Sequence, residues 1–187
     1  MYKRQNCAIA GSVAVCENGN YYNRFYFVHP DGAVQHYDKK HLFTFGGEHK
    51  RFTAGTERVV VNFRGVRILL EVCYDLRFPV WSRNLGDYDM ILYVASWPTP
   101  RVDAWSALLR ARAIENQCYV AGVNRMGVDP ACEYSGGSAI IDPYGKTIAE
   151  CPWSRESAVS ADIDMEALQA FRKKFPVLDD ADPFTLI

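Results

Sequence analysis

One segment of the chain runs through a largely apolar stretch and stops at a cysteine and a polar turn. Residues 66–72 form the stretch, and Cys73, Tyr74, Asp75 and finally Pro79 follow it. Such a segment predicts a buried strand, and a proline just after a turn is typical of the start of a helix. Open α/β sheets carry their ligand sites beyond the carboxyl ends of their strands. The sequence therefore predicts an α/β fold with a functional site at Cys73.

Position alone leaves two interpretations of Cys73. A thiol at a strand end can meet backbone N–H groups and the positive end of a helix dipole, and both favour the nucleophilic thiolate. Free cysteines are also among the most often buried residue types, so an inert core cysteine fits equally well. A second segment decides between them, because it follows a strand and opens a Gly-rich loop: Tyr37-Asp38-Lys39-Lys40-His41-Leu42-Phe43.

These two segments together resemble the carbon–nitrogen hydrolase (nitrilase) superfamily, and most closely its omega-amidase-like branch. The segments Tyr93–Pro98 and Ala111–Gln117 add to the resemblance, which runs from about Cys7 to the C-terminus. It implies a four-layer α-β-β-α sandwich and an amidase that works with a glutamate, a lysine and a cysteine.

The resemblance assigns roles to four residues. Cys73 would form a thioester, and Lys39 would steady the tetrahedral intermediate together with the backbone N–H of Tyr74. Glu48 would orient Lys39 or hold the leaving amine. The alternatives are that Lys39 is a solvated loop lysine and that Glu48 is an exposed loop acid. No cofactor and no metal enters this chemistry.

Two further residues are candidates for substrate binding. Arg77 follows the nucleophile by four residues, and its guanidinium fork suits a substrate carboxylate. The alternative is a structural ion pair with Asp75 or Glu115. Trp97 follows the strand that ends at Ala95 and is either a pocket wall or a core side chain.

Other polar residues near these motifs have supporting or competing interpretations. Arg112, Glu115 and Asn116 are expected to brace the nucleophile turn or a dimer contact. His41 suggests a Cys–His pair of the protease type. The lysine motif explains the segment better, and the sequence shows no evident Asp or Asn to orient this histidine.

The general-base glutamate of the family has no match in this chain. The family carries it after an early strand, whereas residues 7–15 already resemble a middle strand. We therefore expect the chain to lack a strand–helix–strand–helix portion. A fragment of a longer reading frame fits the intact motifs better than a diverged remnant. Without the base we expect impaired catalysis.

The resemblance implies hydrolysis of the terminal amide of 2-oxoglutaramate or 2-oxosuccinamate to the dicarboxylate and ammonia. Two alternatives remain open. The chain could hydrolyse nitriles, carbamoyl compounds or aliphatic amides within the same superfamily. It could also be a non-catalytic interaction module derived from the fold.

Composition excludes several other classes of protein. With 187 residues the chain suits one domain, residues 1–187, and a net charge of −1 provides no basic surface for nucleic acid. No apolar run reaches membrane-spanning length. The six cysteines show no CxxC pair and the four histidines no HExxH pattern. These features favour a cytoplasmic protein with reduced thiols and without a metal site. The resemblance adds a homo-oligomer, a dimer or larger.

Periodicity and turn residues predict the order of the secondary structure. Pro30-Asp31-Gly32 and Arg64-Gly65 read as turns, and Asp103 is a plausible N-cap for the helix that follows it. The expected helices are 79–85, 104–117 and 165–174. The expected strands are 7–15, 21–28, 33–37, 58–63, 66–72, 89–95, 119–123, 138–141, 147–149 and 158–163.

Overall fold

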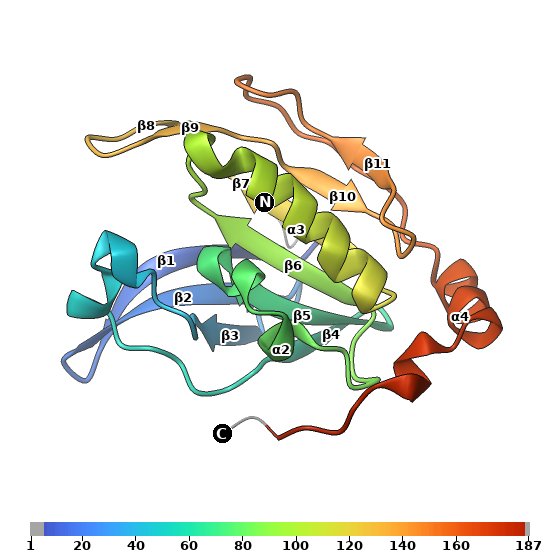
Figure 1. Cartoon of the computed structure of the whole chain (residues 1–187). Helices are drawn as coiled ribbons and strands as arrows, with labels where there is room; N and C mark the ends of the chain where they lie inside the picture. The colour runs from blue at the N-terminus through green and yellow to red at the C-terminus, as the bar shows by residue number, and fades with distance from the viewer. Residues whose placement is uncertain (1–5, 186–187) are drawn as a thin grey trace.

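The computed structural model describes residues 6–185. Its first sheet is an antiparallel meander in the order β1-β2-β3, built from β1 (Ile9–Glu17), β2 (Asn20–Val28) and β3 (Val34–Asp38). Figure 1 shows this sheet beside the larger one. The short connections of a meander explain why these three strands pair with their sequence neighbours.

The second sheet has six strands in the order β11-β10-β7-β6-β5-β4. The central strands β5, β6 and β7 are parallel, and the outer pairings are antiparallel. Residues Arg64 and Gly65, both with φ in the left-handed region, close the β4–β5 hairpin as predicted. The strands are β4 (Val60–Phe63), β5 (Val66–Val72), β6 (Met90–Ala95), β7 (Tyr119–Asn124), β10 (Ala139–Ile141) and β11 (Thr147–Glu150).

The remaining elements are helices and a small hairpin. The hairpin pairs β8 (Met126–Val128) with β9 (Glu133–Ser135). The α-helices are α2 (Pro79–Ser82), α3 (Val102–Glu115) and α4 (Met165–Lys174). Short 3₁₀ turns complete the fold: η1 (Thr44–Gly46), η2 (Glu48–Lys50), η3 (Cys73–Arg77), η4 (Thr99–Arg101) and η5 (Val177–Asp180). No helix within the described range is long and apolar enough to cross a membrane.

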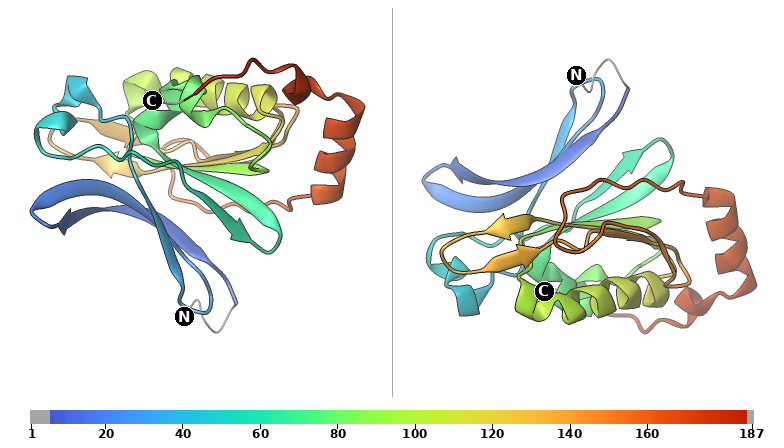
Figure 2. Two further views of the ribbon diagram at one scale, coloured as in Figure 1. Left: turned by 90° about the horizontal axis from the view of Figure 1, so that it is seen from below. Right: turned by 90° about the horizontal axis from the view of Figure 1, so that it is seen from above.

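Strand β5 divides the core because successive side chains of a strand point to opposite faces. Ile68, Leu70 and Val72 pack toward β1–β3, in a cluster that contains Phe25. Leu69 faces the other way, into a cluster beneath α3. The layers are therefore α3, the six-stranded sheet and the three-stranded sheet, as Figure 2 shows.

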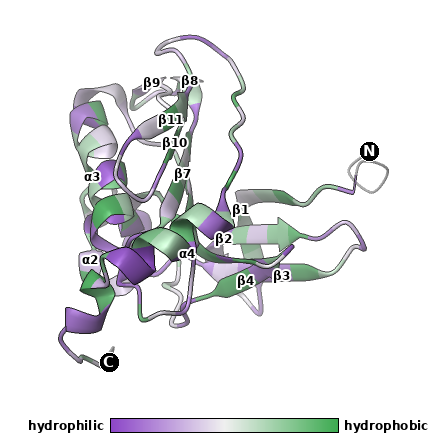
Figure 3. Ribbon diagram, turned by 90° about the vertical axis from the view of Figure 1, so that its right-hand side faces the viewer, coloured by the Kyte–Doolittle hydropathy of each residue, from purple (hydrophilic) through white to green (hydrophobic). Residues whose placement is uncertain are grey.

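The fourth layer of the expected α-β-β-α sandwich is not formed by residues 6–185, because no described helix covers the outer face of β1–β3 (Figure 2). That face carries apolar side chains, and hydrophobic stretches of β1 are visible in Figure 3. Ile9, Val13 and Val34 are each about half exposed there. The mixed α/β class is confirmed, with an apolar sheet face left uncovered within this range.

Most predicted elements are present within a few residues, but three predictions were wrong in detail. Residues 158–163 are not a strand, since 158–160 are exposed and pair with no sheet. The helix predicted over 79–85 ends at Ser82. Asp103 is not the N-cap, because η4 leads directly into a helix that starts at Val102. The β8–β9 hairpin was not predicted at all.

Candidate active site

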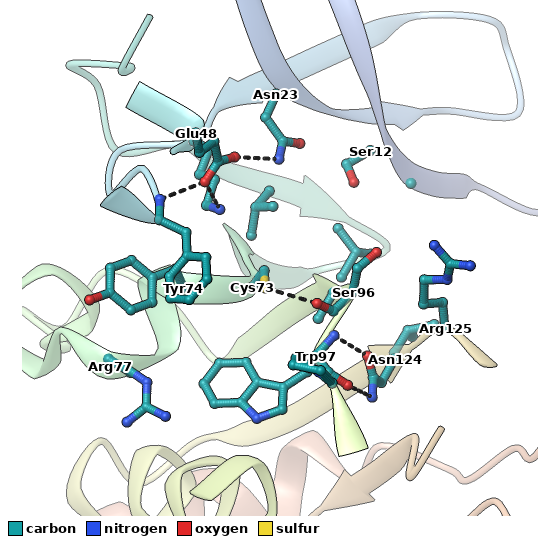
Figure 4. A pocket seen from close by; sticks show the side chains of 18 of the residues that line it. Ser12, Asn23, Glu48, Cys73, Tyr74, Arg77, Ser96, Trp97, Asn124 and Arg125 are labelled. Atoms are coloured by element: carbon teal, nitrogen blue, oxygen red, sulfur yellow. Dashed lines mark hydrogen bonds and ion pairs between the residues drawn. The ribbon is translucent and has the colours of Figure 1, made fainter. Parts of the chain in front are cut away.

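A cavity of about 530 Å³ lies at the carboxyl ends of the parallel strands. Cys73 follows β5, Ser96 and Trp97 follow β6, and Asn124 ends β7, so three neighbouring strands deliver residues to one edge (Figure 4). Strand β1 supplies Ser12 from the opposite sheet. The site therefore lies where the two sheets meet, at the strand ends that the sequence indicated.

Cys73 lies at a sharp turn between β5 and η3, with φ of 50° in the left-handed region. A non-glycine residue in this region stores about 1–3 kcal/mol of backbone strain. Its thiol donates a hydrogen bond to the Ser96 carbonyl at 3.8 Å. Burial raises the pKa of the Cys73 thiol, and the nearby Lys39 ammonium only partly offsets this. Desolvation therefore outweighs the nearby positive charge, and the strand-end position does not by itself favour the thiolate here.

Lys39 and Glu48 form a buried ion pair on the cavity wall. The Lys39 ammonium donates to Glu48 Oε2 at 2.7 Å, and Asn23 Nδ2 donates to Oε1 at 3.1 Å (Figure 4). The Phe43 N–H donates to Oε2 as well, at 2.6 Å. Burial alone would raise the pKa of Glu48, but the Lys39 charge and these hydrogen bonds together lower it. Glu48 is thus a charged residue in contact with Lys39, which is compatible with the first of the two roles considered for it, orienting that lysine.

Asp75 joins the lysine segment to the nucleophile turn. Its Oδ1 accepts the His41 N–H at 2.9 Å and lies 2.8 Å from His41 Nδ1. Its Oδ2 accepts from the Tyr37 hydroxyl at 2.8 Å and from the Val72 N–H at 3.0 Å. Asp75 is fully buried. Sequence patterns did not predict this role, because the partners of Asp75 lie up to 38 residues away.

His41 does have an orienting carboxylate, contrary to the sequence interpretation. Asp75 provides it, and the imidazole also stacks on Phe78 with the ring centroids 3.8 Å apart. His41 does not line the cavity, and the Cys73 thiol donates to Ser96 instead. The geometry therefore supports a structural histidine rather than a Cys–His catalytic pair.

Arg77 and Trp97 both line the cavity. The Arg77 guanidinium lies over the Trp97 ring, with Cζ 4.9 Å from the ring centroid (Figure 4). Arg77 pairs with neither of the acids suggested as structural partners. Asp75 binds His41, and Glu115 binds Arg112. Trp97 serves as both wall and core, because its ring also packs against the buried ring of Trp105 in helix α3.

The nucleophile turn is braced from helix α3. Arg112 Nη2 donates to the Leu76 carbonyl at 2.6 Å, and Asn116 Oδ1 accepts from the Asn84 N–H at 2.9 Å. This confirms the predicted bracing role of Arg112. Tyr74 occupies the first turn of η3, where backbone N–H groups lack partners within the helix.

Glu71 is a second buried carboxyl close to the nucleophile. It accepts from Ser82 Oγ at 2.9 Å, and its Oε1 has no partner among the described residues. Burial raises the pKa of Glu71 to about 8, and the charge of Asp75 adds to this effect. Glu71 does not line the cavity. It is therefore a mostly protonated core residue at neutral pH.

Sequence reasoning missed two asparagines that shape the site. Asn23 holds Glu48, as described above, and Asn124 Oδ1 accepts the Trp97 N–H at 2.7 Å. Asn124 Nδ2 also donates to the Trp97 carbonyl at 3.0 Å. Asn124 directly follows the strand predicted over 119–123, and this position at a strand end was the one sequence signal for its role. Across residues 6–185, no cluster of three or more histidine, cysteine or acidic side chains is arranged to hold a metal ion.

Comparisons with known proteins agree with this geometry. The carbon–nitrogen hydrolase family matches residues 1–173. The omega-amidase YafV of Escherichia coli K12 is 54% identical over 182 residues, which are 97% of this chain and 71% of the relative. The 2-oxoglutaramate amidase of Bacillus subtilis 168 is 42% identical over 175 residues, which are 92% of this chain and 67% of that protein.

A crystal structure with the same fold supports this assignment. The crystallised protein is a carbon–nitrogen hydrolase superfamily protein of Xanthomonas campestris, with an arsenic adduct in its active site. It aligns with a TM-score of 0.96 and 47% identity, over 100% of this chain and 73% of that one. With the strand-end cysteine and the buried lysine–glutamate pair in place, the chain belongs to the carbon–nitrogen hydrolase family, in the omega-amidase-like branch of the nitrilase superfamily.

Proposed function

We propose that this amide-hydrolysing enzyme releases ammonia from short oxo-dicarboxylic acid monoamides, namely 2-oxoglutaramate and 2-oxosuccinamate. The observation that carries the proposal is a cavity in which Cys73 shares a wall with the buried Lys39–Glu48 pair. The names of the relatives from Escherichia coli and Bacillus subtilis support the substrate class. Arg77, which lines the cavity, suits the free carboxylate of such a substrate.

The reaction proceeds through a thioester. The Cys73 sulfur attacks the amide carbon, and the developing oxyanion accepts hydrogen bonds from the Lys39 ammonium and the Tyr74 N–H. The C–N bond then breaks, and the nitrogen leaves as ammonia with the proton that the thiol gave up. Water next attacks the thioester, which releases the carboxylic acid and restores the thiol. One donor to an oxyanion is typically worth about 3–4 kcal/mol in the transition state.

The proton transfers need a base, and the described cavity offers a poor one. Glu48 is the only carboxylate among the described residues that line it. Its oxygens already accept from Lys39, Asn23 and Phe43, and its pKa is lowered. The raised pKa of Cys73 makes the need for a base greater. Since general base catalysis contributes about 10²–10⁴-fold, we propose that the 187-residue chain turns over slowly to that extent.

The decisive experiment measures ammonia release from 2-oxoglutaramate by the purified chain and by its Cys73→Ala variant. The same assay is run with three comparison substrates: pentanenitrile, an N-carbamoyl amino acid and pentanamide. The proposal requires Cys73-dependent release that is fastest with the oxo-acid amide. Trapping with hydroxylamine should yield the hydroxamate of a thioester. A higher rate with the nitrile or the carbamoyl compound would overturn the substrate class, and full family-like turnover would overturn the impairment.

Three broader proposals accompany the activity. The 187 residues form one domain, and a single cooperative step in urea unfolding would test this.

The chain forms a homo-oligomer. The uncovered apolar face of β1–β3 supports self-association, and light scattering would measure the mass of the assembly. The protein works in the cytoplasm, as the cysteine pattern indicates. Fractionation of cells that produce it would test this location.

A further inference from the structure

Two arginines that line the cavity lack polar partners in the described part of the chain. No hydrogen bond or ion pair involves the guanidinium groups of Arg77 and Arg101 within residues 6–185. Arg77 is exposed, so water can solvate it, but Arg101 is half-buried. Other arginines withdrawn from solvent have polar partners, as Arg24 has in Asp38 and Arg83 in the Glu115 carbonyl. Arg101 therefore stands out as a half-buried cation whose guanidinium has neither a carboxylate nor a carbonyl partner among the described residues.

Aromatic walls hold both guanidinium groups. Arg101 Cζ lies 5.4 Å from the Phe43 ring centroid, and Arg77 Cζ lies 4.9 Å from that of Trp97. A guanidinium stacked on a ring keeps the N–H donors at its edge free. Trp97 Nε1 also donates to the Arg101 carbonyl at 2.7 Å, which links the two supports. Both forks are thus held by stacking and have free donors.

The charges around the cavity do not balance. The Lys39 charge is compensated by Glu48 at 2.7 Å. Arg125 lies 3.6 Å from Asp129 and stacks on Tyr134 with Cζ 4.4 Å from the ring centroid. No other carboxylate belongs to the described lining. The remaining two positive charges, on Arg77 and Arg101, therefore have no compensating carboxylate in the described lining.

We infer that Arg101 is a specificity-determining residue that binds the carboxylate end of the substrate from the Phe43 wall, while Arg77 approaches from the Trp97 wall. The amide end then lies at Cys73. This inference rests on the proposed function and deepens it, because it adds a second arginine to the recognition of the substrate carboxylate. An arginine fork binds a carboxylate in a fixed orientation, whereas a lysine acts as a point charge.

The test measures binding separately from turnover, because slow chemistry must not hide the result. NMR titration follows 2-oxoglutaramate on the Cys73→Ala chain, with and without Arg101→Gln. We expect the Kd to rise roughly 10- to 100-fold when the charged hydrogen bonds are lost. Arg101→Lys should recover only part of the affinity. An unchanged Kd in Arg101→Gln would overturn the inference, with Tm and circular dichroism used to verify that the variant is folded.

Arg125→Gln is the matched control, since it removes a cavity charge that Asp129 already compensates. Its Kd should change less than about threefold, and a loss equal to that of Arg101→Gln would show a general charge effect and refute the specific one. In the Cys73 enzyme, kcat/KM for pentanamide should not depend on Arg101. If the unsubstituted chain does not prefer the oxo-acid amide to pentanamide, the proposed function fails. If it does and Arg101→Gln keeps the preference, only this inference fails.

Discussion

Replacing Asp75 with asparagine should destabilise the protein far more than one lost negative charge on a surface would. Asp75 is buried, and all four of its partners are donors: two groups of His41, the Tyr37 hydroxyl and the Val72 N–H. An asparagine keeps one acceptor oxygen and turns an NH₂ group toward the other two donors. The substitution therefore breaks two hydrogen bonds and places donors against donors.

The magnitude follows from the number of bonds lost. A hydrogen bond to a charged group contributes about 1.5–3 kcal/mol, so losing two lowers the free energy of unfolding by about 3–6 kcal/mol. Whole domains have only about 5–15 kcal/mol. With a urea dependence of about 2 kcal/mol per molar, the unfolding midpoint of Asp75→Asn should fall by about 1.5–3 M.

Urea unfolding followed by tryptophan fluorescence measures this loss, and Asp129→Asn provides the control. Asp129 also accepts three hydrogen bonds, from the N–H groups of Ala131 and Cys132 and the Tyr134 hydroxyl, but it is only partly buried. Its replacement should move the unfolding midpoint much less, because water can replace the lost partners at a partly exposed site. If Asp75→Asn unfolds within 1 kcal/mol of the unsubstituted protein, or no earlier than Asp129→Asn, the reasoning about Asp75 is wrong.

Three further changes have defined outcomes. Lys39→Met should lower kcat/KM for 2-oxoglutaramate roughly 10²–10³-fold, and a loss below threefold would contradict its oxyanion role. Glu71 keeps its proton in the folded state up to a pKa of about 8 but loses it near 4.5 when unfolded. Stability should therefore fall by about 3 kcal/mol between pH 5.5 and 7.5, and urea midpoints of Glu71→Gln should lack this slope. Gly55→Ala places a Cβ 2.0 Å from the Asp38 carbonyl oxygen, so its Tm should fall well below that of Gly11→Ala, which meets nothing within 4 Å.

The sequence predictions that the structure confirms rest mostly on local patterns of side chains. The apolar stretch 66–72 and the pair Arg64-Gly65 specify a strand and a hairpin through their own side chains, and the structure contains both. The strand end then placed Cys73 at the edge of the sheet. Family motifs supplied Lys39 and Glu48, whose contact local patterns alone could not predict.

The missed features depend on contacts between distant parts of the chain. Asp75 meets His41 across 34 residues, and Asn23 meets Glu48 across 25, so no local spacing reveals either pair. The pKa of Cys73 is likewise set by how deeply the fold buries it, which a strand-end position does not determine. The segment 158–163 shows the reverse case, in which a plausible strand pattern found no sheet to join.

The distance between the two reacting groups depends on how the two sheets pack against each other. Lys39 directly follows β3 of one sheet, and Cys73 directly follows β5 of the other. Phe25 and Leu70 fill the space between those sheets. Any sliding of one sheet over the other changes the separation of nucleophile and ammonium before either sheet loses its own hydrogen bonds. Replacing an interlayer side chain such as Phe25 with a smaller one would thus lower activity without touching the substrate. Heating would likewise abolish activity at temperatures where the strands of each sheet are still paired.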